Sequence, residues 1–189
     1  MSEQQNQNLV ETYQDGKVVF DGKIIRLEHW TVKLPNGNLA LREVACHPGA
    51  SAVVALDEDN NVILVHQYRA PMHRVTLEIP AGKLAPGEDP ADCAVRELEE
   101  ETGLKAERMT LLTSVLTTPG FCTEKIGIYL AQGLSQGETH PDEDEFLGVV
   151  RMPLEEAINL VMRGEIRDGK TICGLLMARE VIRSQKEKA

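Results

Sequence analysis

Hydrophobic and polar residues alternate along the first part of the chain. Two such runs lie within residues 17–46, and the sequence PNGN separates them. Asn36 followed by Gly37 is a strong hairpin signal, because both residues tolerate the positive φ that a two-residue turn requires. The pattern therefore predicts short antiparallel strands. The sequence HPGA at residues 47–50 interrupts it, and we take residues 1–47 as an N-terminal β extension.

Residues 48–189 are predicted to form the main domain. Apolar runs at 51–56 and 61–69 flank the turn DEDNN and predict a second strand pair. Pro153 suits the first position of a helix that Gly164 ends. In all, the pattern predicts three helices, at 90–102, 154–163 and 172–184, and further strands near 77–82, 109–116, 125–134 and 145–153. This order predicts an α/β fold in which a mixed β-sheet is sandwiched between helices (α/β/α).

The first helix is marked at both ends. Asp89 is a suitable N-cap, Pro90 occupies the first helical position, and Gly103 lies where a glycine commonly ends a helix. Apolar residues at i, i+3, i+4 and i+7 predict the face that packs against the core: Ala91, Ala94, Val95 and Leu98.

The same helix carries four glutamates within five residues: Glu97, Glu99, Glu100 and Glu101. Like charges one turn apart destabilise a helix by roughly 0.2–0.5 kcal/mol a pair. Glu97 and Glu101 flank the apolar face, and Glu100 lies beside them. Glu99 is expected to point to solvent. Arg96, four residues before Glu100, is placed to support it.

The formal net charge of −10 comes from two segments. Residues 88–108 hold eight acidic and three basic side chains, and residues 136–146 hold five acidic and none basic, a balance of −5 in each. They are either solvated surfaces or segments that meet around divalent cations, which prefer oxygen ligands. The negative charge, with only 4% aromatic residues, argues against a nucleic acid partner.

Composition fits a globular protein with one substantial domain, at 189 residues and 42% hydrophobic content. The start, MSEQQNQN, lacks the features of a signal peptide, and no apolar run approaches the ~18 residues of a membrane span. We therefore expect no membrane partner. No CxxC pair occurs, which indicates free, buried thiols in a reducing cytoplasm rather than zinc or disulfides, for Cys46, Cys93, Cys122 and Cys173.

The loop before the acidic helix has glycines at 82 and 87, a spacing that superficially resembles a phosphate-binding P-loop. A P-loop continues with Lys and Ser or Thr, whereas Glu88 and Asp89 follow here. An acid at this place repels phosphate unless a metal lies between them. The P-loop interpretation is therefore rejected.

The complete pattern is Gly82-x5-Glu88-x7-Arg96-Glu97-Leu98-x-Glu100-Glu101-x-Gly103-Leu104. It resembles the Nudix box, GX5EX7REUXEEXGU with U aliphatic, at every specified position. The resemblance implies a Nudix fold that binds two or three Mg²⁺ ions, which Mn²⁺ can replace. Such ions neutralise a pyrophosphate, orient the leaving phosphate and help to deprotonate water. Without metal, the clustered carboxylates are expected to repel one another.

The resemblance extends over most of residues 18–165 and reaches the ADP-ribose pyrophosphatase subfamily. Pro119 stands sixteen residues after Gly103, the place of a proline that marks this subfamily. Pro119 and Gly120 open the loop PGFCTE, which is expected to contact substrate. In this subfamily the N-terminal sheet packs across a homodimer, and each active site takes residues from both chains. The resemblance thus implies a homodimer.

The resemblance also assigns roles within the box. The backbone carbonyl of Ala81 and the side chains of Glu97 and Glu101 correspond to metal ligands. Glu100 corresponds to a third ligand or to a group that positions water. The remaining specified residues support the structure of the box: Gly82, Glu88, Arg96 and Gly103.

In the subfamily that the chain resembles, catalysis also uses an acidic loop far from the box. The sequence DEDEF at residues 142–146 matches this loop. Glu145 is our choice for the general base, and Glu143 is the second choice. A base has to come within ~3 Å of its water, so the loop would have to close.

Four residues outside the box are candidates for substrate binding. Arg69 is expected to contact a phosphate or ribose; a surface charge is the alternative. Arg42 and Glu43 are expected to hydrogen-bond adenine from the partner chain, and Trp30 to stack on it. The alternatives are sheet surface for the pair and hydrophobic core for Trp30.

The resemblance implies Mg²⁺-dependent hydrolysis of ADP-ribose to AMP and ribose 5-phosphate. Two alternatives remain open. One is hydrolysis of another nucleoside diphosphate sugar, such as GDP-mannose or ADP-glucose. The other is a non-catalytic Nudix module that binds ADP-ribose, although no box glutamate is missing here.

Overall fold

The structure of the chain is a computed structural model that describes residues 8–137 and 146–187. The chain divides into two compact units. The first comprises Met1–Pro48 and Leu116–Glu124, and the second comprises Gly49–Val115 and Lys125–Ala189. The second unit contains the whole acidic helix with the loop before it.

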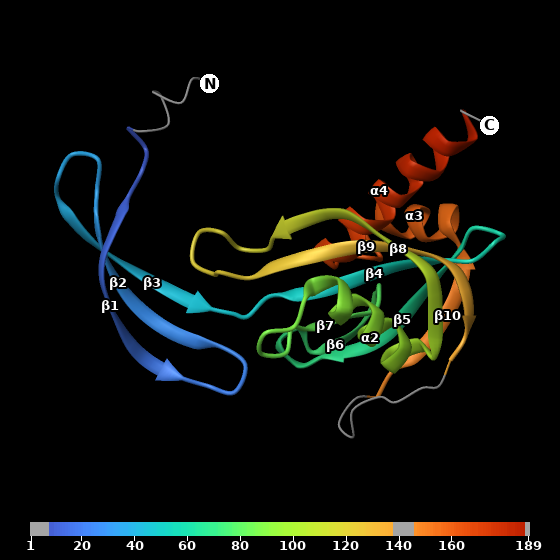
Figure 1. The fold of residues 1–189 in the computed structure, drawn as a ribbon, viewed down its shortest axis with the longest axis horizontal. Coiled ribbons are helices and arrows are strands. Elements are labelled where there is room, and N and C mark those ends of the chain that lie inside the picture. The colour runs from blue at the N-terminus through green and yellow to red at the C-terminus, as the bar shows by residue number, and fades with distance from the viewer. Residues whose placement is uncertain (1–7, 138–145, 188–189) are drawn as a thin grey trace. The chain divides into compact units, whose positions relative to one another are not determined.

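The first unit is built on a three-stranded antiparallel sheet in the order β1-β2-β3 (Figure 1). The strands are β1 (Thr12–Asp21), β2 (Arg26–Lys33) and β3 (Leu39–Cys46). The predicted hairpin between β2 and β3 is confirmed. The connection is residues 34–38 rather than a two-residue turn, and of Asn36 and Gly37 only Gly37 has a positive φ, at 88°. Strand β1 begins five residues before the predicted alternation.

The segment Leu116–Glu124 lies beside the end of β3 in the first unit. The backbone N–H of Ala45 donates to the carbonyl of Phe121 at 2.7 Å, and that of Thr123 donates to the carbonyl of Ala45 at 3.0 Å. Strands β8 (Leu104–Leu116) and β9 (Lys125–Gln136) flank this segment in the chain. This attachment was not predicted from the sequence.

The second unit holds a seven-stranded mixed sheet in the order β10-β5-β4-β9-β8, with β6 paired to β5 and β7 paired to β4. Strand β4 pairs in parallel with β9 and antiparallel with β5 and β7, which confirms the predicted mixed sheet. A short 3₁₀ turn, Ala70–Met72, follows β5. The strand bounds are Ala50–Leu56 (β4), Asn61–Arg69 (β5), Arg74–Glu78 (β6), Ala81–Lys83 (β7), Leu104–Leu116 (β8), Lys125–Gln136 (β9) and Gly148–Pro153 (β10).

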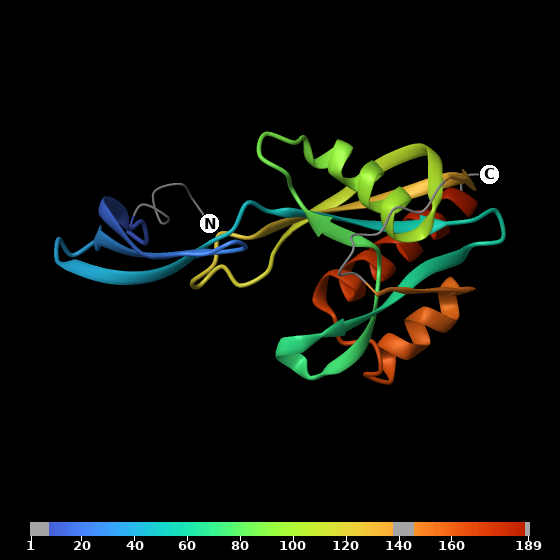
Figure 2. The same ribbon diagram turned by 90° about the horizontal axis from the view of Figure 1, so that it is seen from below.

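Helices cover both faces of this sheet (Figure 2). Because neighbouring residues of a strand point to opposite faces, β4 serves both cores. Val54 belongs to the cluster that includes residues of α3 (Leu154–Met162) and α4 (Gly169–Lys186). Val53 belongs to the cluster that includes residues of α2 (Pro90–Thr102). The predicted α/β/α layering is confirmed.

The ends of α2 are as predicted. The side chain of Asp89 accepts a hydrogen bond from the N–H of Ala91 at 2.8 Å, and Gly103 ends the helix with a φ of 68°. Its predicted core face needs correction, because Val95 is exposed. The buried side of the helix includes Glu97 and Glu101 together with Cys93, Ala94, Leu98 and Thr102.

The last two helices differ slightly from prediction. Pro153 is the N-cap of α3 rather than its first helical residue, and α4 begins three residues earlier than expected, after the N-cap Asp168. The side chain of Asp168 accepts from the N–H of Thr171 at 3.0 Å. This cap explains the early start of α4.

All four cysteines are free, but they are not all buried as predicted. Cys93 is buried, Cys46 and Cys122 are half-buried, and Cys173 is exposed on α4. Within the described residues, no helix combines the length and the apolar character needed to cross a bilayer.

Candidate active site

Two glutamates of α2 lie over the short strand β7. The backbone N–H of Ala81 donates to Oε2 of Glu101 at 3.1 Å. Glu97 lies so close to Gly82 that a Cβ at residue 82 would overlap its carboxylate. Both glutamates are buried, with exposed fractions of 8% for Glu97 and 5% for Glu101. The absence of a side chain at Gly82 thus lets an acidic helix pack against this strand.

Arg96 is the centre of the carboxylate cluster. Its guanidinium donates to Glu88 through Nε at 2.8 Å and through Nη2 at 3.0 Å. Nη1 donates to Glu97 at 2.6 Å and to Glu100 at 2.8 Å. One cation therefore contacts three acids, and the mutual repulsion expected in the metal-free protein is partly offset by Arg96. The spacing in the sequence predicted only its contact with Glu100.

Glu88 connects the loop before α2 to Arg96 of the same cluster. The hydrogen bond from Arg96 and a second one from the N–H of Ala85 lower the pKa of Glu88 to about 2. The bond with Glu88 in turn raises the pKa of Arg96. Burial raises the pKa of Cys93 to about 11, and the negative charge of Glu88 adds to this. The thiol is therefore protonated at neutral pH, whereas the Glu88 carboxylate stays ionised.

Glu99 was expected to point to solvent, but its side chain is only 28% exposed, and Lys105 lies 3.0 Å from its Oε1. Glu99 therefore provides a natural comparison for the glutamates that face β7.

The predicted donor set has the chemistry that Mg²⁺ requires. Glu97, Glu100 and Glu101 would supply carboxylate oxygens and Ala81 would supply a carbonyl, all of them hard ligands. Within residues 8–137 and 146–187, however, no three His, Cys, Asp or Glu side chains are grouped so that they could hold a metal ion. Arg96 holds oxygens of Glu97 and Glu100 instead. Metal binding would exchange these contacts with Arg96 for contacts with the ion.

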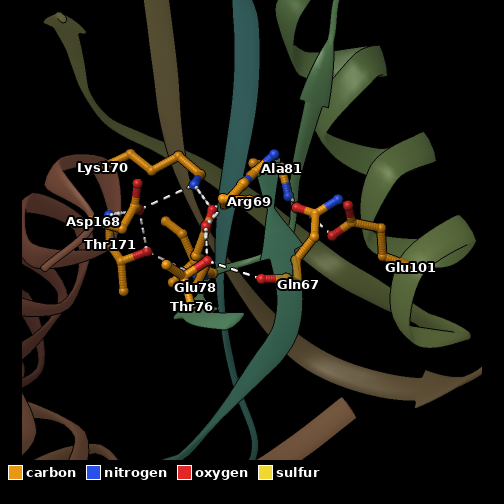
Figure 3. A network of polar contacts seen from close by, with 10 residues as sticks. Gln67, Arg69, Thr76, Glu78, Ala81, Glu101, Asp168, Lys170 and Thr171 are labelled. Carbon is orange, nitrogen blue, oxygen red and sulfur yellow. Dashed lines mark hydrogen bonds and ion pairs between the residues drawn. The ribbon is translucent and has the colours of Figure 1, made fainter. Parts of the chain in front are cut away.

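A second polar network lies near the box, at the ends of β5 and β6 (Figure 3). Arg69 donates to Glu78 through Nε at 2.8 Å and through Nη2 at 2.7 Å. Thr76 Oγ1 also donates to Glu78, at 2.6 Å, and the Nζ of Lys170 forms a further bond with it. Burial raises the pKa of Glu78, but the bond from Arg69 and the charge of Lys170 outweigh this and lower it to about 2.

Arg69 is also electrostatically linked to the box. The hydrogen bond with Glu78 raises the pKa of Arg69, and the negative charges of Asp168 and Glu101 contribute in the same direction. Because Glu101 is one of the glutamates over β7, the guanidinium of Arg69 lies within the field of the box carboxylates.

The other predicted substrate residues belong to the first unit. Arg42 pairs with Glu11, with Nε 2.9 Å from Oε2, and Glu43 is largely exposed. Trp30 donates from Nε1 to Glu28 at 2.6 Å and packs edge-on against Tyr13, with ring centroids 5.5 Å apart.

Trp30 is therefore half-buried in the sheet rather than part of a hydrophobic core. Pro119 and Gly120 are exposed in the segment beside β3. The two candidates for the general base, Glu143 and Glu145, lie outside the described residues.

Glu78 and Lys170 were not predicted from the sequence. Glu78 is an acid between Leu77 and Ile79 at the end of a strand, and an acid in such an apolar setting is a signal for a buried ion pair. Its partner Lys170 is 92 positions away in sequence, so no local pattern could identify it.

Comparison with known proteins identifies the family of this chain. Residues 46–175 match the family described as NUDIX domain, and the chain belongs to that family. The matched range includes the whole box and the Arg69–Glu78–Lys170 network. With its complete set of box glutamates, the chain is a Nudix hydrolase.

Similar proteins include two bacterial relatives and one solved structure. The "ADP-ribose pyrophosphatase" of Bacillus subtilis (strain 168) is 44% identical over 172 residues, which cover 89% of this chain and 93% of the relative. The "Methanol dehydrogenase activator" of Bacillus methanolicus is 46% identical over 156 residues, or 82% and 84% of the two chains. A crystal structure of an ADP compounds hydrolase has a TM-score of 0.81 at 26% identity and covers 94% of this chain and 97% of its own.

Proposed function

We propose that this protein hydrolyses ADP-ribose to AMP and ribose 5-phosphate in a Mg²⁺-dependent reaction. The observation that carries this is the packing of Glu97 and Glu101 over β7, with Glu100 beside them and every acid of the box present. The relatives named ADP-ribose pyrophosphatase and ADP compounds hydrolase support the choice of substrate.

The proposed metal ligands are the carbonyl of Ala81 and the carboxylates of Glu97, Glu100 and Glu101. When bound there, Mg²⁺ supplies charge neutralisation for the pyrophosphate and acidifies water. Mn²⁺ has the same preference for carboxylate and carbonyl oxygens and is expected to substitute. Two or three ions are proposed by family resemblance.

The chain's own groups supply the remaining chemistry. Arg69 is proposed to bind a phosphate, because its guanidinium is fixed on one side by Glu78 and 39% of its side chain remains exposed. Water adds to one phosphorus, the bridging P–O bond breaks, and the water proton passes to Glu145. Comparison of Glu145→Gln with Glu143→Gln tests this choice: the base is the residue whose loss lowers kcat with little change in KM.

A homodimer is part of the proposal. Large apolar side chains of the first unit's sheet are exposed in the single chain, including Tyr13, Val18, Phe20, Leu39 and Leu41. Large apolar side chains left exposed on one small sheet favour an interaction surface. Arg42, Glu43 and Trp30 of the partner chain are proposed to contact adenine, with Pro119 and Gly120 at the substrate. Sedimentation at graded concentrations would show a monomer if the dimer assignment is wrong.

The free cysteines fit a cytoplasmic location.

The decisive test of the proposed function is product chromatography after incubation with ADP-ribose, with Mg²⁺ and with a chelator. GDP-mannose, ADP-glucose and NADH serve as competing substrates. We expect AMP and ribose 5-phosphate only with Mg²⁺, and formed fastest from ADP-ribose. Faster cleavage of ADP-glucose or NADH would transfer the activity to that adenine nucleotide. Faster cleavage of GDP-mannose would also remove the adenine assignments. If no compound is cleaved, the remaining interpretation is a non-catalytic Nudix module that binds ADP-ribose.

The relative from Bacillus methanolicus favours a second candidate function, activation of a methanol dehydrogenase. The test is a dehydrogenase assay with the wild-type protein and with Glu97→Gln. Activation by the wild type alone would mean that the hydrolase site is also needed for this role. No change in dehydrogenase rate would exclude the second candidate.

A further inference from the structure

Lys170 and Glu78 form a buried ion pair, and neither side chain takes part directly in the proposed hydrolysis. The side chain of Glu78 is 2% exposed and that of Lys170 is 8% exposed. Removing such ions from water is costly, and buried ion pairs often stabilise a fold less than apolar residues of similar size. An ionic arrangement of this kind therefore calls for an explanation other than stability alone.

Three elements converge on this buried pair, as Figure 3 shows. Arg69 is the last residue of β5, Glu78 is the last residue of β6, and Lys170 lies in the first turn of α4. Lys170 also lies 3.0 Å from Asp168, the N-cap of that helix. The contact with the N-cap of α4 thus restrains the ammonium of Lys170, whose side chain would otherwise be flexible.

The same helix start holds the backbone of the β6–β7 connection. The hydroxyl of Thr171 donates to Asp168 at 2.5 Å and accepts from the backbone N–H of Ile79 at 3.0 Å. Two residues later, Ala81 donates to Glu101 of the box. Hydrogen bonds at Ile79 and Ala81, which the backbone of residues 79–81 joins, therefore connect α4 with the carboxylates of α2.

Arg69 is the most exposed ionic side chain of this network, at 39% against 24% for Asp168. Glu78 receives two parallel hydrogen bonds from its guanidinium, a geometry that fixes the plane of the group as well as its position. Thr76 and Lys170 hold the carboxylate from its other sides. The buried members cannot reach a ligand, whereas Arg69 can.

We propose that Glu78 and Lys170 are positioning residues for the hydrolysis of the pyrophosphate: they hold the Arg69 guanidinium at the edge of the box, where it binds the substrate's phosphate. This inference rests on the proposed function. Lys170 acts through Glu78, and Glu78 acts through Arg69. Neither buried residue contacts the substrate.

A double-mutant cycle tests this order. Lys170→Met removes the ammonium but keeps the length of the side chain, and we expect the KM for the best substrate to rise about tenfold with a smaller change in kcat. Arg69→Met should raise KM at least as much. In the Arg69→Met background, Lys170→Met should change KM less than about twofold, because residues that act through a shared partner are not additive. Lys170→Arg should restore part of the loss.

A purely structural role predicts a different result. The two effects on KM would then multiply, and Lys170→Met would lower the melting temperature equally in both backgrounds. Asp57→Asn is the matched control: its carboxylate is 11% exposed and pairs with Arg151 on β10, away from Arg69. It should leave KM within about twofold of the wild type. Multiplying effects of Lys170→Met and Arg69→Met would overturn the inference.

Two further measurements keep the inference testable. If Lys170→Met does not fold, Thr76→Val removes one hydrogen bond to Glu78 and should show the same non-additivity with Arg69→Met. The NMR signal of the Arg69 Nε–H, identified by its loss in Arg69→Met, needs no substrate. We expect this signal to lose its protection from exchange in the Lys170 or Thr76 variant. An unchanged signal would overturn the inference even if the wild type cleaved no ADP-ribose, so the two proposals can fail separately.

Discussion

Replacing Glu97 by glutamine is expected to lower the turnover of ADP-ribose by at least ~100-fold, because metal catalysis supplies several kcal/mol of transition-state stabilisation. Glu97 is buried against Gly82 and is a proposed ligand of Mg²⁺. Glutamine has nearly the same shape but no charge, so the packing over β7 should survive. The hydrogen bond from Arg96 changes from charge-assisted to neutral on one side.

Kinetics and Mg²⁺ titration calorimetry on the same preparations provide the measurement. We expect kcat to fall, Mg²⁺ affinity to fall, and the circular dichroism spectrum to remain unchanged. Glu99→Gln is the matched control, since it makes the same chemical change two residues away, where the side chain pairs with Lys105. Its kcat should stay within about twofold of the wild type, because Glu99 is not a proposed ligand of the catalytic metal. Full Mg²⁺-dependent turnover in Glu97→Gln would remove the box from the mechanism.

The fold was predictable where the signals are local. The Asp89 cap, Pro90 and the αL conformation of Gly103 act within one helical turn, and the bounds of α2 match the prediction. The hairpin at Asn36 and Gly37 is equally local. Pairings between distant segments were not predictable: β10 lies beside β5, and Leu116–Glu124 lies beside β3. A single sequence carries no signal for such contacts.

The error at Val95 has an instructive physical reason. Hydrophobic periodicity assumes that the buried face of a helix is apolar. In α2 the buried face includes Glu97 and Glu101, because β7 offers a glycine and a backbone N–H there instead of side chains. The face is thus rotated toward the acids, and Val95 is left exposed. The pattern fails at the candidate active site, where function competes with packing.

The box motif did identify which acids gather, but not what holds them. Arg96 bonds to three glutamates, although its sequence position indicated only one of them. The partners of Arg69 were missed for a related reason. Each such contact depends on side-chain directions and on distant elements, which spacing along the chain does not specify.

Gly82→Ala is expected to reduce turnover nearly as much as Glu97→Gln, with a much smaller effect on stability. Gly82 has no left-handed backbone, so alanine is compatible with its conformation. The obstacle is space: the added Cβ would overlap the carboxylate of Glu97. Because that carboxylate is the end of a flexible side chain, it can move away, and the loss of unfolding free energy should stay below about 3 kcal/mol.

The displaced carboxylate can no longer occupy the place where it would bind metal, so kcat and Mg²⁺ affinity should fall together. Urea unfolding and steady-state kinetics measure the two effects separately. Gly169→Ala is the matched control, because its Cβ would meet nothing within 4 Å. It should leave both quantities near wild-type values. A Gly82→Ala variant with normal turnover would show that Glu97 does not need its position over β7, and the metal assignment would then have to move to other oxygen donors.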